Sequence, residues 1–378
     1  MKIGVLKETR PGECRVALTP EVVKLLLKKG FQVVVEAQAG LASAFSDQSY
    51  QDSGAQVLPR ARVFAEAQLF LKVNSFTQEE VLEMPSGASC ISFLYAYTVP
   101  EVVAALNQKQ ISAFAMDAVP RISRAQKMDA LSSQANLAGY KAVLMGANAL
   151  GKIFPLMMTA AGTITPSKVL IFGAGVAGLQ AIATAKRLGA VVEVTDVRPE
   201  TKEQVESLGG RFLTVEGTEG VEIVGGYAKE VSADFLAKQK ALVEERIKEA
   251  DLVITTALVI GKKAPVLITE EMVKSMKPGS VIVDMAVESG GNCALSQLNQ
   301  TLEVHDVTII GQANLPSLLP INASQLYATN ISTLLMHVAT PEGLKLELEE
   351  EITQGCLITH QGNIVHAFTQ SLIKSLPS

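Results

Sequence analysis

Apolar residues gather along the first third of this chain in short runs, and stretches with helical spacing separate them. The apolar runs cover residues 1–6, 31–36, 68–73, 89–95 and 111–116. Short apolar runs rich in β-branched residues are typical of buried strands. Strands that alternate with helices predict a parallel sheet covered by helices on both faces.

Residues that start and stop helices lie between these runs. Thr19 precedes Pro20, as an N-cap precedes a proline at the first helical position, and Gly30 ends the predicted helix. Thr77 and Glu80 have the spacing of a capping box. A further helix is predicted over residues 100–108.

A second alternation of strands and helices begins at Lys168, after a long helix predicted over residues 131–150. Its predicted strands are residues 169–172, 191–195, 252–255, 281–284 and 307–310, and its predicted helices are residues 176–188, 227–249 and 322–337. Residues 216–226, rich in Gly, Thr and Glu, are expected to form an exposed loop.

The fold class expected from these two alternations is α/β, with two Rossmann-like domains whose parallel sheets are joined by long helices around a cleft. Residues 1–134 plus 325–378 would form the first domain, which we expect to be flavodoxin-like. Residues 135–324 would form a dinucleotide-binding domain.

Composition narrows the class of protein. The 378 residues are 48% hydrophobic and 19% charged, which is typical of a globular chain, and the net charge of −5 gives no reason to expect nucleic acid. No apolar run is long enough for a membrane span or a signal peptide. The four cysteines, Cys14, Cys90, Cys293 and Cys356, form no CxxC pair. We therefore expect a reducing cytosol, with no disulfide framework and no metal site.

A glycine motif follows the predicted strand at residues 169–172 and opens the next helix. Gly173, Gly175 and Gly178 fit G-x-G-x-x-G, and Asp196 ends the following strand, 18 residues after Gly178. In such a turn the three glycines permit a tight bend, close approach of a pyrophosphate, and close packing of helix on strand. Unpaired N–H groups at the helix start would bind the phosphates.

The acidic residue favours NAD(H) over NADP(H). Asp196 would accept hydrogen bonds from the adenosine ribose, and its charge would repel a 2′-phosphate, although Arg198 nearby weakens that preference. The alternative is a glycine-rich turn that binds no ligand.

Residues 120–140 form an unusual charged segment in front of the long helix, with Arg121, Arg124, Gln126 and Asp129 close together. Taken alone, it could be a charged loop that caps the helix through Ser132 or Ser133.

This segment closely resembles the mobile active-site loop in the NAD(H)-binding domain of proton-translocating NAD(P) transhydrogenases. The resemblance extends over essentially the whole chain. It includes residues 7–13, 159–163, 225–230, 254–258 and 287–292, in the order that the family has them.

The resemblance implies roles for individual residues. Gln126 would contact the dihydronicotinamide, Arg121 and Asp129 would form a charged pair beside it, and Ser132 would bond the carboxamide or ribose region. The implied cofactor contacts are Gly173, Ala174, Gly175, Val176, Gly178, Asp196, Val197, Arg198, Gly226, Tyr227, Gln239 and Leu258. Gly226 and Tyr227 would belong to a mobile loop that closes on the nucleotide.

The resemblance also implies a reaction and partners. Hydride would pass directly between NAD(H) bound here and NADP(H) on a partner subunit, coupled to proton movement through a membrane subunit. The chain would form a homodimer and would lie on the cytoplasmic face of a bacterial membrane, held there by its partner subunits.

Two alternatives remain open. Alanine dehydrogenase resembles the chain more distantly, and Arg15 and Lys72 match the residues with which it holds pyruvate. Its catalytic His and Asp, however, correspond to Tyr95 and Glu288. The chain has four histidines and none before His305, whereas oxo-acid reduction usually needs a group that titrates near neutrality.

We therefore expect Arg15 and Lys72 to be structural. The second alternative is a nucleotide-binding regulatory module without a redox role. The charged groups of residues 121–129 argue against it, because sensing alone does not need them.

Overall fold

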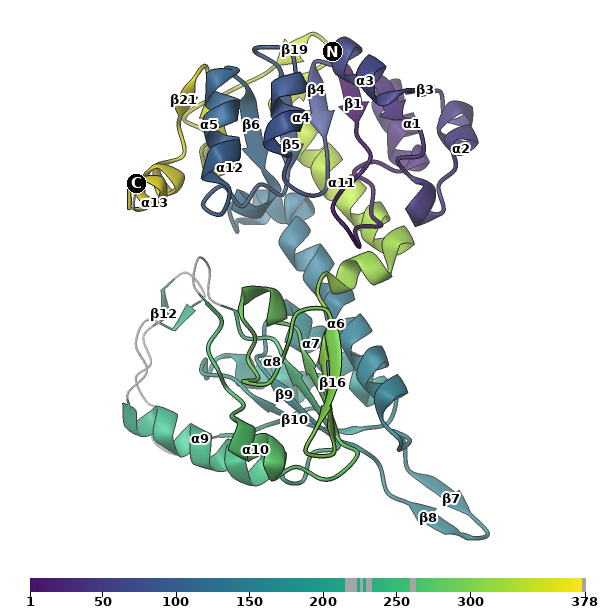
Figure 1. Cartoon of the computed structure of the whole chain (residues 1–378), viewed down its shortest axis with the longest axis vertical. Helices are drawn as coiled ribbons and strands as arrows, with labels where there is room; N and C mark the ends of the chain where they lie inside the picture. Colours follow the sequence, from purple (N-terminus) through teal and green to yellow (C-terminus); the bar gives the residue numbers. More distant parts are fainter. Residues whose placement is uncertain (215–222, 225–226, 229–232, 259–262, 376–378) are drawn as a thin grey trace. The chain divides into compact units, whose positions relative to one another are not determined.

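The computed structural model describes residues 1–214, 223–224, 227–228, 233–258 and 263–375. The chain forms two compact units, one made of Met1–Gln134 with Pro316–Ser378 and the other of Ala135–Leu315 (Figure 1). The predicted return to the first unit at residue 325 lies inside helix α11 (Pro320–Val338), which belongs to the first unit over its whole length.

The first unit contains an eight-stranded sheet in the order β21-β20-β6-β5-β4-β1-β2-β3. Its parallel strands are β1 (Lys2–Val5), β2 (Gln32–Glu36), β3 (Gln56–Leu58), β4 (Leu69–Leu71), β5 (Ser89–Ser92) and β6 (Ser112–Ala115). The C-terminal part of the chain adds β20 (Leu357–His360), antiparallel to β6, and then β21 (Asn363–Ile364), antiparallel to β20.

The second unit contains a seven-stranded sheet in the order β11-β10-β9-β14-β15-β17-β16. Its strands are β9 (Lys168–Phe172), β10 (Val191–Thr195), β11 (Arg211–Phe212), β14 (Leu252–Thr255), β15 (Val281–Asp284), β16 (Gln300–Val304) and β17 (Val307–Gly311). All are parallel to their neighbours except β16, which pairs antiparallel to β17.

The parallel strands of both sheets follow one order. In each unit the chain starts at a central strand, runs outward on one side, returns to the other side of the first strand and continues outward there. This is the 3-2-1-4-5-6 order of dinucleotide-binding sheets. The expectation that the first unit is flavodoxin-like is therefore wrong, because flavodoxin-like sheets have the order 2-1-3-4-5. The order reverses between β1 and β4 in the first unit and between β9 and β14 in the second. Ligands of open α/β sheets bind at such a switch point.

Helices pack on the sheets, among them the helices that the sequence predicted, and the expected α/β fold class is confirmed. They are α1 (Pro20–Lys28), α2 (Asp47–Asp52), α3 (Arg60–Glu66), α4 (Gln78–Glu83), α5 (Pro100–Gln108), α6 (Ala130–Ala149), α7 (Val176–Arg187), α8 (Thr201–Ser207), α9 (Ala233–Ile247), α10 (Glu270–Lys274), α11, α12 (Glu351–Cys356) and α13 (Ala367–Ser375). The Thr77–Glu80 capping box is present at the start of α4.

The helix expected over residues 227–249 begins later than predicted. Its first residues belong to a two-stranded hairpin of β12 (Ile223–Val224) and β13 (Tyr227–Ala228), and α9 starts at Ala233. The β-branched pair at Ile223 and Val224 favours a strand over a helix.

The central strands of both sheets are buried on both faces. All four residues of β5 and all four of β14 and β15 are buried, as parallel strands covered by helices require. Within the described part of the chain, no helix combines the length and the apolar character that a membrane span needs.

Candidate functional site

The glycine turn lies at the switch point of the second sheet, between the end of β9 and the start of α7. Gly173 has φ +99, and its N–H donates to the carbonyl of Thr195 over 2.8 Å. A Cβ atom on Gly173 would overlap Thr256 Oγ1, which follows β14. Backbone conformation and space therefore both require glycine here.

Gly178 brings α7 against this turn. A Cβ atom at Gly178 would overlap the carbonyl oxygen of Gly173, and one at Gly139 of α6 would overlap the carbonyl oxygen of Ala177. Strand, turn and two helices thus meet backbone to backbone, and any larger residue at these two positions would force them apart.

Gly175 differs from its neighbours, because no part of the described chain needs it to be glycine. It is the N-cap of α7 with φ −74, and the nearest atom to an added Cβ is Arg198 Nη2 at 3.9 Å. No side chain among the described residues caps α7. Open space beside uncapped N–H groups at a helix start suits a pyrophosphate, so the residues present fit a dinucleotide.

The carboxylate of Asp196 is engaged by the chain itself. Asp196 Oδ2 accepts from Ala174 N at 2.7 Å and Arg198 Nη2 at 2.9 Å, and Oδ1 accepts from Arg198 N at 2.8 Å and Arg198 Nε at 3.0 Å. Four donors use the acceptor capacity of one carboxylate. Ribose hydroxyls could bond Asp196 only if one of these donors gave way. The positive charge of Arg198 also offsets the repulsion that we expected Asp196 to exert on a 2′-phosphate.

The other predicted cofactor residues are near the same strand ends. Gln239 of α9 donates from Nε2 to Thr195 Oγ1 at 2.9 Å. Leu258 follows β14 and is 52% exposed, and Val197 is partly buried. Gly226 lies outside the described residues, as does the side chain of Tyr227.

Sequence reasoning gave no role to Asp284 and Asn292, which fix the loop after β14. Asp284 Oδ2 accepts from the backbone N–H of Asn292 at 2.8 Å and of Cys293 at 2.9 Å. The Asn292 side chain in turn accepts from Ala257 N at 3.0 Å and donates to Ala257 O at 2.9 Å and Pro265 O at 2.8 Å. An Asp that ends a buried strand was the available signal, since a buried carboxylate needs several donors.

The charged segment in front of α6 has a different cap from the ones expected. Asp129, and neither Ser132 nor Ser133, accepts from the first turn of the helix: its Oδ1 bonds Ser132 N at 2.9 Å and its Oδ2 bonds Ser132 Oγ at 2.6 Å. Among the described residues no ion pair joins Arg121 to Asp129, and the side chain of Arg121 is exposed. The expected Arg121–Asp129 pair is therefore absent, because the carboxylate is used for capping.

Gln126 lies on a short 3-10 helix, η3 (Ser123–Met128), in the middle of this segment. Ala125 and Met128 are buried, while Gln126 itself is exposed. The apolar side of the 3-10 helix thus anchors it and leaves the amide of Gln126 on the outside.

Arg15 and Lys72 are buried in the first unit and bonded to acids. The guanidinium of Arg15 donates to both oxygens of Glu13, Nε to Oε1 at 2.8 Å and Nη2 to Oε2 at 2.7 Å. Lys72 Nζ contacts both oxygens of Glu80, at 3.0 and 2.8 Å. Burial would raise the pKa of Glu13, but the hydrogen bonds and charge of Arg15 outweigh it and lower that pKa to about 2.

The two positions that would complete an alanine dehydrogenase site carry other chemistry. Tyr95 is exposed and its backbone N–H donates to Asp117, while Glu288 accepts from the backbone N–H of Asn314 at 3.1 Å. The described residues also hold no group of His, Cys, Asp and Glu side chains that could bind a metal.

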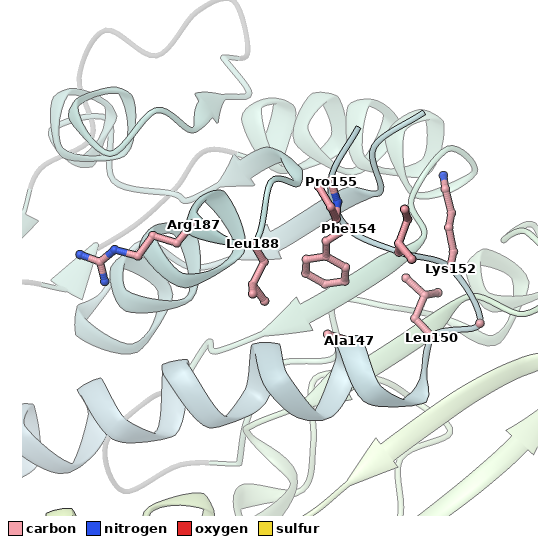
Figure 2. Close-up of a pocket in the computed structure, with 9 residues that line it drawn as sticks. Ala147, Leu150, Lys152, Phe154, Pro155, Arg187 and Leu188 are labelled. Carbon is pink, nitrogen blue, oxygen red and sulfur yellow. The ribbon is translucent and has the colours of Figure 1, made fainter. Parts of the chain in front are cut away.

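A shallow hollow of about 710 Å³ in the second unit is a poor candidate for the site. Figure 2 shows its lining, which includes Leu150, Phe154, Pro155 and Leu188. Leu188 caps the C-terminal end of α7, whereas the glycine turn is at its N-terminal end. A twelve-residue helix separates these two places by about 18 Å.

Comparison with known proteins links the chain to one family. The model described as "Alanine dehydrogenase/PNT, N-terminal domain" matches residues 4–138, and that described as "Alanine dehydrogenase/PNT, C-terminal domain" matches residues 142–367. One relative, from Rhodospirillum rubrum, is named as the first portion of an NAD(P) transhydrogenase subunit alpha. It is 51% identical over 376 residues, which are 97% of this chain and 98% of that protein.

Two further relatives are less similar in sequence and match the chain over nearly its whole length. The structure titled "The crystal structure of transhydrogenase from Sinorhizobium meliloti" has a TM-score of 0.89 and 45% identity, and the match covers 97% of this chain and 100% of that one. The "Alanine dehydrogenase" of Bacillus subtilis (strain 168) is 30% identical over 375 residues, 97% of this chain and 93% of that protein.

Proposed function

The chain belongs to the alanine dehydrogenase/PNT family, and from this premise we propose that it is the NAD(H)-binding subunit of a proton-translocating NAD(P) transhydrogenase. The observation that carries the proposal is the glycine turn at the switch point of the second sheet. It combines an uncapped helix start with open space at Gly175. It is supported by the similarity that extends over 97% of this chain and 98% of the first portion of a transhydrogenase subunit alpha.

NAD(H) would be held by the turn and by the strand ends around it. Ala174, Gly175 and Val176 would bind the pyrophosphate through backbone N–H groups, with Gly178 keeping the helix close. Asp196, Val197 and Arg198 would contact the adenosine. We propose further contacts from Gly226, Tyr227, Gln239 and Leu258, on the resemblance alone.

The bound cofactor would supply the chemistry, in which a hydride passes between C4 of its nicotinamide and C4 of NADP(H) on a partner subunit. The chain then has to orient the ring and exclude water, and it needs no nucleophile. We propose that Gln126 contacts the dihydronicotinamide from η3, with Arg121, Asp129 and Ser132 close to it. The capping bonds of Asp129 hold Ser132 at the start of α6.

Partner subunits complete the proposal. One would span the membrane and carry protons and another would bind NADP(H), so this subunit would lie on the inner face of the bacterial cytoplasmic membrane.

We also propose a homodimer, supported by the hairpin of β7 (Met157–Thr159) and β8 (Gly162–Ile164), which projects from the second unit in Figure 1. Met158 on it is 78% exposed, and exposed apolar side chains of this kind favour a subunit contact.

The decisive experiment mixes the purified chain with an NADP(H)-binding transhydrogenase subunit and follows reduction of an NAD analogue by NADPH. We expect turnover in the mixture and none with either subunit alone. Mixtures that bind both nucleotides and still transfer no hydride would contradict the proposal.

Alanine dehydrogenase activity is the second candidate, favoured by Arg15 and Lys72. Both cations are already paired with acids of the chain, and no histidine precedes His305. An incoming carboxylate would have to displace Glu13 or Glu80 from buried ion pairs, at a cost of several kcal/mol.

A further inference from the structure

One buried amide joins the Gln126 segment to the body of the first unit. Asn330 lies on α11 and is 7% exposed. Its Nδ2 donates to the carbonyl of Lys127 at 2.8 Å, and its Oδ1 accepts from Ser133 Oγ at 2.7 Å. A single side chain thereby bonds the residue next to Gln126 and the first turn of α6.

The same network continues to the buried Arg15. Gln134 Nε2 donates to Ser133 Oγ at 3.4 Å and to Ala323 O at 3.1 Å, and Gln134 Oε1 accepts from Arg15 Nη1 at 2.9 Å. The cation that an alanine dehydrogenase would use for its substrate is therefore bonded, through Gln134, to the helix that carries Ser132.

A second tie to the segment is much weaker. Arg124 lies 3.1 Å from Glu350, but its side chain is 62% exposed, and exposed ion pairs contribute little. An unpaired buried amide, in contrast, is costly. Of these two ties, Asn330 is the one whose loss should move the segment.

We propose that Asn330 is a positioning residue for Gln126, an inference that rests on the proposed transhydrogenase function. Its bond to the Lys127 carbonyl restricts the backbone directly after Gln126, and the buried side chains of Ala125 and Met128 anchor the backbone before and after this point. The backbone that carries Gln126 is thereby held in place before nucleotide binds. Asn330 touches no reacting atom and acts only through the loop.

The test measures hydride transfer and NADH binding for Asn330→Ala and Asn330→Asp, with the full chain mixed with the NADP(H)-binding subunit. Asn330→Asp keeps the size of the side chain and the acceptor for Ser133, and replaces the donor to Lys127 with a carboxylate oxygen. The melting temperature of each variant shows whether it folds. Thr329→Ala, on the exposed neighbour in α11, is the matched control.

We expect kcat to fall about tenfold or more in both Asn330 variants, because small misplacements of positioning groups are expensive. The NADH dissociation constant should stay within about twofold, since the glycine turn is intact. In a Gln126→Ala background, the same substitutions should lower kcat no further, because residues that act through one another are not additive.

Three results separate the possible failures. Wild-type kcat in the Asn330 variants, or losses that add fully to that of Gln126→Ala, would overturn the positioning role. An inactive wild-type mixture would instead contradict the proposed function. In that case hydrogen exchange of the amides of residues 123–129 tests the inference. Faster exchange in Asn330→Ala than in Thr329→Ala would support the positioning role of Asn330, and equal exchange in the two variants would overturn it.

Discussion

Gly175 and Gly178 are three positions apart and are required for different reasons. Gly178 serves the fold, since a Cβ atom there would overlap the carbonyl oxygen of Gly173. At Gly175 the nearest atom to an added Cβ is 3.9 Å away, so the fold does not need glycine there, and under the proposed function the open space would receive the pyrophosphate. One substitution at each position therefore separates folding from binding.

Gly175→Ala should leave the melting temperature within about 2 °C of wild type, because an unstrained surface substitution changes stability little. It should nevertheless weaken NADH binding about tenfold or more, because the methyl group would fill the space where a pyrophosphate approaches. Gly178→Ala should lower the melting temperature by several degrees. Calorimetry and NADH fluorescence titration measure the two effects, and unchanged NADH affinity in Gly175→Ala would show that the turn is not the phosphate site.

Glu13 gives a prediction that depends on pH. Its pKa of about 2 in the folded chain lies below the ordinary value of 4.5, so its ionised form stabilises the fold. That contribution is present above pH 4.5 and is lost as pH falls toward 2. Glu13→Gln should therefore lower the free energy of unfolding by about 3 kcal/mol at pH 7.

The difference between Glu13→Gln and wild type should shrink as pH is lowered from about 4.5 toward 2. Urea unfolding at several pH values measures it, with Glu349→Gln at an exposed position as the control. A difference that stays constant with pH would mean that the Glu13–Arg15 pair does not account for the stabilisation.

At the scale of elements, local patterns predicted most of the fold. The helix at α5 and the strand at β10 have the predicted bounds, because capping residues and apolar runs act within a few positions. The antiparallel β20 could not be assigned a partner, since its pairing with β6 joins residues about 240 positions apart.

In the candidate functional site, too, local sequence patterns predicted only the features that depend on residues close together in the chain. The glycine turn is a local motif and was found. The cap at Asp129 and the pairing of Asp196 with Arg198 were not predicted, because each depends on which of several nearby donors forms hydrogen bonds with the carboxylate. Asn330 contacts Lys127 across the fold of the first unit, and no local signal marks it.

The β7–β8 hairpin gives a prediction for the proposed homodimer. Met158→Asp should raise the dimer dissociation constant about 30-fold or more, since a charge would replace an apolar contact. It should leave the melting temperature of the monomer unchanged, because Met158 is 78% exposed. Sedimentation velocity measures the association, with Leu348→Asp, on a 52% exposed leucine of the first unit, as the control. A Met158→Asp variant that remains dimeric would exclude the hairpin as the contact.

At the scale of the whole molecule, the proposed function excludes the alanine dehydrogenase reaction. The purified chain should show no NAD-dependent oxidation of L-alanine, because Arg15 and Lys72 are bonded to acids and no histidine precedes His305. An alanine dehydrogenase assayed under the same conditions provides the positive control. Turnover with alanine would reassign the chain to that branch of its family.

The discontinuous first unit has a consequence for synthesis of the protein. The edge of β6 is covered by β20, and roughly 240 residues separate Ala115 from Leu357. At synthesis rates of about 5–20 residues per second, a ribosome needs roughly 10–50 s to make them. During that time β6 has no neighbour on one side, whereas the second unit is continuous in sequence and can fold first. The nascent chain thus carries an open sheet edge while its nucleotide-binding unit takes shape, and aggregation during expression should start at that edge.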